Sequence, residues 1–199
     1  MTPAAILMAR ANTGSSRRDA IASYSSRFNQ LGMSVSTSGE STLRALFTLE
    51  TGLGMRESSG NYCTGWDTSA GSSRASSEAE AGPFQTSFNS FSASSELGKL
   101  YAYYQAHPSS CLLAAYKQGA SCAAQSILGS GAGAAYQRFV KSCPAFAADS
   151  AAITLRVLRG HFGPIIRGEA EVTSGCNQLF TDVARFVDQD PANACDELL

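Results

Sequence analysis

One stretch of the chain concentrates residues that could transfer protons. Glu57 ends the run Met55-Arg56-Glu57, and the acids Glu78 and Glu80 follow just before Gly82-Pro83-Phe84-Gln85. A glutamate at the end of an apolar helix loses part of its hydration, which raises its pKa and lets it keep a proton near neutrality, as a general acid must. A second carboxylate across a cleft could orient or activate water. Two such carboxyl groups are the working parts of glycoside hydrolysis.

The second carboxylate has three candidates. Glu80 is favoured because it directly precedes the Gly82–Gln85 segment and has small neighbours that would let a sugar approach. Glu78 and Asp67 are the alternatives. Each of these acids could instead be a solvated loop residue, and Glu57 could instead pair with a nearby arginine.

Four further residues are candidates for substrate contact. Tyr62 and Trp66 could stack on sugar rings, or could anchor a glycine-rich loop. The Gln85 amide could bind substrate or stabilise its own turn. His161 is expected where the chain returns from a central helix to the cleft, with a helix C-terminal cap as the alternative.

No metal or other cofactor is expected. The chain has two histidines, and no His, Asp, Glu or Cys cluster shows metal-ligand spacing. A nucleophilic pair of Cys63 with His161 is disfavoured because it would leave an odd number of cysteines and because nothing nearby favours a thiolate.

Hydrophobic periodicity predicts the elements that must position these residues. Apolar residues at helical spacing predict helices at 18–31, 41–57, 94–104, 111–118, 134–141, 145–159 and 176–187. Pro144 stands where a helix-opening proline belongs, and the following alanine-rich segment is apolar on most sides, as in a central helix. Residues 58–77 are rich in Gly, Ser and Thr and are expected to form a loop or short β-hairpin. The expected fold class is therefore mainly α (α+β), with a small loop or hairpin insert at the cleft.

Length and composition favour a single domain and exclude some partners. The chain has 199 residues and a formal net charge of −1, with 16% charged residues. Such a balanced charge offers no footprint for nucleic acid, and no apolar run is long enough to span a membrane. We expect one domain, 1–199, made of an N-terminal helical extension (1–40), a catalytic helix and hairpin (41–92) and a helical core (93–199). Its oligomeric state is left open.

The six cysteines predict disulfides and export. They are widely spaced and contain no C-x-x-C, which disfavours a zinc ribbon. Three disulfides are expected, with Cys111–Cys122 as the favoured pair, although six buried thiols are an alternative. We expect a secreted or periplasmic protein. Met1–Arg10 lacks the basic start of a leader peptide, so a leader has been removed or export follows another route.

The segments Glu57-Ser58 and Gly82-Pro83-Phe84-Gln85 together resemble the lysozyme-like superfamily, which includes goose-type lysozymes, lytic transglycosylases and plant-type chitinases. In those families a helix ends in Glu-Ser or Glu-Thr with the catalytic acid, and a hairpin leads into Gly-x-x-Gln. The run 82–89 is especially similar to the chitinase version. The resemblance covers roughly residues 41–89, about a quarter of the chain.

The resemblance implies a lysozyme-like helical domain that hydrolyses a polysaccharide, with a β-1,4-linked amino-sugar polymer, peptidoglycan or chitin, as substrate. Glu57 would be the general acid and Glu80 its partner. The mildly acidic isoelectric point, about 6.1, disfavours adhesion to anionic cell walls, so another glycan stays open. The alternatives are a lytic transglycosylase, a catalytically silent carbohydrate-binding module and, more vaguely, a disulfide-stapled toxin or inhibitor.

Overall fold

The computed structural model describes residues 2–68, 71, 73–120 and 126–191. Within these ranges the fold is mainly helical, as predicted, and contains no strand. The expected β-hairpin is not confirmed: the β structure of the described residues is a single antiparallel bridge between Ala81 and Thr86. The segment before it, rich in Gly and Ser, has no alternating apolar pattern that could bury one face of a hairpin.

The helices are joined by connections of unequal length. Their bounds are α1 Pro3–Ala9, α2 Ala20–Ser23, α3 Ser25–Gln30, α4 Glu40–Ser58, α5 Ser95–Ala106, α6 Leu113–Lys117, α7 Gly131–Ser142, α8 Pro144–Val157, α9 Gly163–Arg167 and α10 Ser174–Gln189. The 3₁₀ turns η2 Phe88–Ala93, η3 Pro108–Cys111 and η4 Arg159–His161 lie between them.

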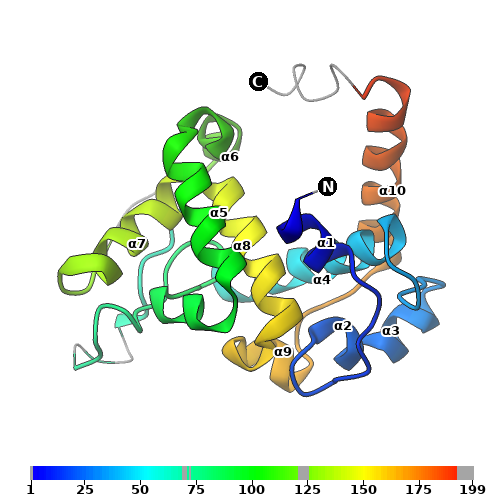
Figure 1. Ribbon diagram of the computed structural model, residues 1–199, viewed down its shortest axis with the longest axis horizontal. Helices are drawn as coiled ribbons and strands as arrows, with labels where there is room; N and C mark the ends of the chain where they lie inside the picture. The colour runs from blue at the N-terminus through cyan, green and yellow to red at the C-terminus, as the bar shows by residue number, and fades with distance from the viewer. Residues whose placement is uncertain (1, 69–70, 72, 121–125, 192–199) are drawn as a thin grey trace.

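Helix α8 is the central helix that the sequence predicts. Pro144 occupies its first turn, where a missing N–H costs nothing. Ala147, Ala151 and Ile153 are completely buried, since α8 packs against helices on several sides. Figure 1 shows α8 (yellow) crossing the molecule between α5 and α4.

Helix α4 carries Glu57 and contains two glycines that allow close packing. A Cβ on Gly52 would lie 2.1 Å from the carbonyl oxygen of Glu171, and a Cβ on Gly54 would lie 2.9 Å from the Phe84 ring. The absent side chains therefore let the segment before α10 and the aromatic ring of the Gly82–Gln85 turn approach the helix backbone. This contact brings the turn next to the end of α4.

The helix predicted at 18–31 is broken into α2 and α3. Tyr24 separates the two, with φ −98° and ψ 5°, outside the helical region. Asp19 caps α2 by accepting from the Ile21 backbone N–H at 3.0 Å, and the same carboxylate pairs with Arg156 of α8 at 3.1 Å. Periodicity correctly marked the buried face of the segment, because Ile21, Tyr24 and Phe28 all lie in the core. It could not reveal the break.

Two apolar clusters form the interior. The larger joins α1, α2, α3, α4, α8 and α9, and the smaller joins α5, α7 and the start of α8 around Tyr136 and Phe146. Phe84, Phe91 and Leu100 contact both clusters. The turn that contains Phe84 therefore lies at the junction of the two.

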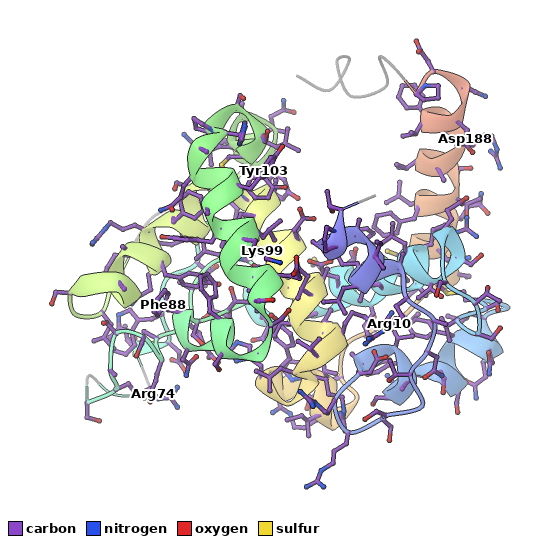
Figure 2. The ribbon with its side chains drawn as sticks, in the orientation of Figure 1. Arg10, Arg74, Phe88, Lys99, Tyr103 and Asp188 are labelled. Atoms are coloured by element: carbon purple, nitrogen blue, oxygen red, sulfur yellow. A yellow bond between two sulfur atoms is a disulfide. The ribbon has the colours of Figure 1, made fainter. Side chains whose placement is uncertain are left out.

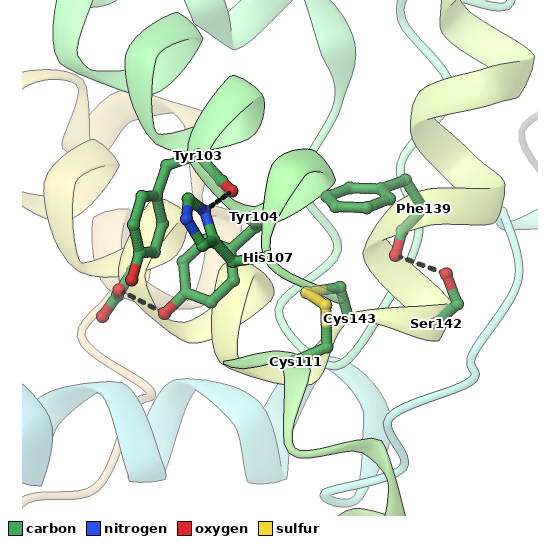
Figure 3. The surroundings of a disulfide bond; sticks show 8 residues. Tyr103, Tyr104, His107, Cys111, Phe139, Ser142 and Cys143 are labelled. Carbon is green, nitrogen blue, oxygen red and sulfur yellow. Dashed lines mark hydrogen bonds between the residues drawn. A yellow bond between two sulfur atoms is a disulfide. The ribbon is translucent and has the colours of Figure 1, made fainter. Parts of the chain in front are cut away.

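The disulfide pairing differs from the sequence prediction. Cys111 is bonded to Cys143, which corrects the expected Cys111–Cys122 pair. The bond ties η3 to the start of α8 beside Tyr104 (Figure 3). Cys122 lies outside the described residues, whereas Cys63 is also disulfide-bonded and Cys176 is a free thiol. The expected three disulfides are therefore not all formed. A short sequence separation was a poor guide, because helix packing decides which cysteines meet.

Helix α10 projects away from the other helices in Figure 1. It contacts α4 near its start, where the rings of Phe47 and Phe180 lie 6.0 Å apart. Within the described part of the chain, no helix combines the length and apolar character needed to cross a membrane.

Candidate active site

Glu57 is held at the very end of α4 by a left-handed cap. Ser59 takes φ 55° and its N–H donates to Met55, while the Gly60 N–H returns to the Gly54 carbonyl at 3.2 Å. Ser58 also donates its hydroxyl to the Gly54 carbonyl, at 3.0 Å. The Ser-Ser-Gly sequence thus satisfies the last carbonyls of the helix and ends it directly after Glu57.

Glu80 precedes a tight turn that is fixed by its backbone. Ala81 and Thr86 exchange both N–H···O bonds, at 3.0 and 3.2 Å. Gly82 takes φ 80°, and a Cβ there would lie 3.0 Å from Val140. The hydroxyl of Tyr136 donates to Thr86 at 2.7 Å, which ties the turn to α7. These contacts give Glu80 a rigid base.

Gln85 stabilises the turn from inside. Its side-chain amide donates to the carbonyls of Gly82, at 3.0 Å, and Gly65, at 3.3 Å. The residue is 8% exposed and has φ 48°. Its side chain therefore serves the turn-stabilising role, because its amide N–H groups point at backbone carbonyls instead of at a ligand.

His161 connects η4 to this turn. Its Nε2–H donates to the Gln85 carbonyl at 3.2 Å, and the same nitrogen lies 3.9 Å from Glu80 Oε1. Burial lowers the pKa of His161, while the bond to the carbonyl raises it. His161 is therefore a neutral imidazole near neutral pH, with its Nε2 protonated.

These groups face one polar cavity of about 380 Å³. Its lining comprises Arg56, Glu57, Glu80, His161, Gly163, Pro164, Arg167 and Glu169. The structure therefore brings together three of the residues proposed from the sequence, Glu57, Glu80 and His161, from three separate parts of the chain.

The environment of the cavity raises the pKa values of both carboxyl groups. Burial raises the pKa of Glu57 to about 7, and the negative charge of Glu80 adds to this rise, while Arg167 opposes it. Burial also raises the pKa of Glu80, whose charge is favoured by Arg74 and disfavoured by Asp67. Repulsion between the two acids makes it favourable for one of them to hold a proton.

The other proposed residues lie around the cavity without lining it. Tyr62 is 6% exposed, which fits the loop-anchor alternative. Trp66 is partly buried, and Glu78 and Asp67 are exposed. Of these, Asp67 acts on the cavity through its charge, which raises the pKa of Glu80.

Sequence reasoning missed the charged residues on the far side of the cavity. Arg167 donates from Nε and Nη2 to the two carboxylate oxygens of Glu169, at 2.8 and 2.9 Å, and Arg56 lies 3.5 Å from the same carboxylate. Gly163 makes room for this arrangement, since a Cβ there would lie 2.8 Å from Arg167 Nη1. The sequence signal is the Arg-Gly-Glu run that begins at the last residue of α9, which no known spacing rule connects with Glu57.

The described residues contain no group of three or more His, Cys, Asp or Glu side chains that could hold a metal ion. The chemistry that the cavity offers is proton transfer between carboxyl groups, assisted by a neutral imidazole and two guanidinium groups.

Comparison with protein-family models, curated proteins and solved structures finds no match to this chain. The lysozyme-like resemblance therefore stays a prediction that rests on Glu57-Ser58 and Gly82–Gln85.

Proposed function

We propose that the chain is a glycoside hydrolase that cleaves a polysaccharide by general acid–base catalysis. The observation that carries this proposal is the pairing of Glu57 and Glu80 in one polar cavity, with a Glu57 pKa of about 7. Glycoside hydrolysis needs one protonated and one ionised carboxyl group at the scissile bond. The two carboxyl groups of this cavity repel each other when both are ionised, which favours one shared proton and supports the proposal.

Glu57 is the proton donor in this mechanism. Its raised pKa keeps it protonated up to about pH 7, so it can transfer its proton to the glycosidic oxygen as the bond from that oxygen to the anomeric carbon breaks. The leaving sugar then carries the proton as a hydroxyl group. Glu57 is left as a carboxylate and regains a proton before the next turnover.

Glu80 is the second carboxylate. It accepts a proton from the water whose oxygen bonds to the anomeric carbon, so the product ends in a hydroxyl at that carbon. Arg74 favours the ionised form of Glu80, and ionised Glu80 in turn favours protonated Glu57. His161 orients this side of the cavity through its bond to the Gln85 carbonyl.

The proposed substrate is a β-1,4-linked amino-sugar polymer, peptidoglycan or chitin, which the resemblance implies. The Cys111–Cys143 disulfide supports a secreted or periplasmic location, where such polymers occur and disulfides persist.

The test is incubation of the full chain with a panel of glycans, followed by mass spectrometry of the products. We expect the wild type to release products that have a reducing end. The Glu57→Gln variant should release no products. Anhydro-sugar ends would instead identify a lytic transglycosylase. Binding to a glycan without cleavage would identify a silent carbohydrate-binding module. The proposal would be contradicted if the chain neither bound nor cleaved any glycan of the panel.

A further inference from the structure

A second cavity gathers arginines that are far apart in the sequence. It has a volume of about 400 Å³ and lies where the loop before α2 meets the end of α8. Its polar lining comprises Arg10, Thr13, Ser15, Arg18, Asp19 and Arg156. Figure 2 shows Arg10 beside α2. None of these residues lines the cavity that contains Glu57.

Arg156 is the buried base of this second cavity. Its side chain has no exposed surface. Its Nη1 donates to the Met8 carbonyl at 3.1 Å, and its Nη2 donates to the Ala11 carbonyl at 3.0 Å and to Asp19 at 3.1 Å. Its Nε–H, also buried, has no hydrogen-bond partner among the described residues. A buried donor without an acceptor is costly, so it marks a place where an acceptor would be stabilising.

The charges that line the cavity are unbalanced. Asp19 is the one acid among the described residues of the lining, and it pairs with Arg156. The two positive charges of Arg10 and Arg18 are therefore not balanced by a carboxylate among these lining residues. Burial lowers the pKa of Arg156, Asp19 raises it, and the charge of Arg10 lowers it further, so Arg10 and Arg156 repel each other.

Donor groups remain for a ligand. Arg18 lines the cavity and donates its Nε–H to the Val157 carbonyl at 3.4 Å, so this bond does not use its Nη groups. Ser15, which has a hydroxyl group, also lines the cavity. Arg159 reinforces the positive potential from just outside the lining, because its side chain donates to the Ser16 carbonyl and its backbone N–H donates to the Arg18 carbonyl.

We propose that this second cavity binds a phosphate group. Guanidinium and hydroxyl donors that converge from separate segments suit a tetrahedral anion, whose oxygens point in several directions. A volume of about 400 Å³ exceeds that of a phosphate ion and leaves space for the organic part of a phosphate monoester. The site is independent of the glycoside hydrolase proposal, because it shares no lining residue with that cavity.

The test is isothermal titration calorimetry of the full chain with inorganic phosphate and with glycerol 1-phosphate, at constant ionic strength set by chloride. We expect saturable binding of one phosphate group per chain. Arg10→Gln and Arg18→Gln should each weaken it by about tenfold or more, since each removes a charged donor. Arg138→Gln, at an exposed position of α7, is the matched control and should bind like the wild type. Arg156 is left intact because its loss would strand Asp19 in the core.

The two ligands separate the sources of the phosphate. Tighter binding of glycerol 1-phosphate supports a phosphate monoester as ligand, and equal binding supports free phosphate. The proposal is overturned if neither ligand binds above the chloride background. It is also overturned if both arginine variants keep their circular dichroism spectrum and bind phosphate as the wild type does.

Discussion

The carboxyl group of Glu57 should be indispensable for cleavage and dispensable for folding. Glu57→Gln keeps the size of the side chain but removes the proton donor, so we expect turnover to fall by about 10²- to 10⁴-fold or more. Initial rates on the best glycan, with circular dichroism as the check on folding, measure this. Near wild-type turnover would show that Glu57 is not the acid.

The same variant should change how stability depends on pH. The pKa of Glu57 is about 7 in the folded chain against an ordinary value of 4.5, so the folded state binds more protons between these pH values. Stability therefore falls as pH rises through this window and stays lowered above it. Glu57→Gln removes this penalty. We expect the melting temperature of the variant to exceed that of the wild type at pH 8, and we expect this difference to shrink towards pH 4. An equal difference at both pH values would contradict the assigned pKa.

The second carboxylate can be identified by comparing three acids. Glu80→Gln should lower turnover about as much as Glu57→Gln, because Glu80 lines the cavity. Glu78→Gln, which alters an exposed side chain, should have little effect. Asp67→Asn should keep activity but shift the acidic limb of the pH–activity profile to lower pH, since the charge of Asp67 raises the pKa of Glu80. A dead Glu78→Gln or Asp67→Asn with an active Glu80→Gln would reassign the base.

At the scale of single residues, the sequence pointed to those that belong to local motifs. Glu57 was singled out at a helix end and lies in the cavity, whereas Gln85, singled out in a tight turn, supports that turn. Arg167 and Glu169 were missed since they reach the cavity through the packing of α9, which no local pattern records. The burial of Tyr62 fits the loop-anchor alternative, which the sequence could not separate from stacking on a sugar ring.

At the scale of elements, two helix glycines make a matched pair. Gly52→Ala in α4 places a methyl group 2.1 Å from the Glu171 carbonyl oxygen, so the backbone must move, and we expect a loss of about 1–3 kcal/mol. Gly98→Ala in α5 meets nothing within 4 Å and should stabilise the chain by about 0.5–1 kcal/mol. Urea unfolding of both variants tests this. Equal effects of the two substitutions would show that α4 and the Glu171 segment are not in contact.

Elements with a strong apolar period were predicted well. α5, α8 and α10 lie within a few residues of their expected positions, because each has caps or a proline at its ends. The helix predicted at 18–31 begins at Ala20, because Asp19 caps it and pairs with buried Arg156 of a distant helix, and it is interrupted at Tyr24. The loop alternative for residues 58–77 fits the structure, in which the β structure of the described residues is the one bridge between Ala81 and Thr86.

At the scale of the whole molecule, the cysteine pairing can be mapped without reductant. Trypsin should release one linked peptide pair that contains Cys111 and Cys143, and iodoacetamide should label Cys176. We expect mass spectrometry to find the pair and to lose it after reduction. A Cys111–Cys122 peptide pair would contradict the structure.

The Cys111–Cys143 bond closes a loop with a sequence separation of 32. Replacing both cysteines by alanine should lower the free energy of unfolding by about 3–4 kcal/mol on the chain-entropy estimate for such a loop. The bond also changes what a single proteolytic cut can do. A chain cleaved anywhere between residues 112 and 142 remains covalently joined, with α8 on one fragment and α4 on the other. Such nicked protein would migrate as one band on a denaturing gel and separate into two when a thiol is added, so damage within this loop would pass unnoticed in a non-reducing assay.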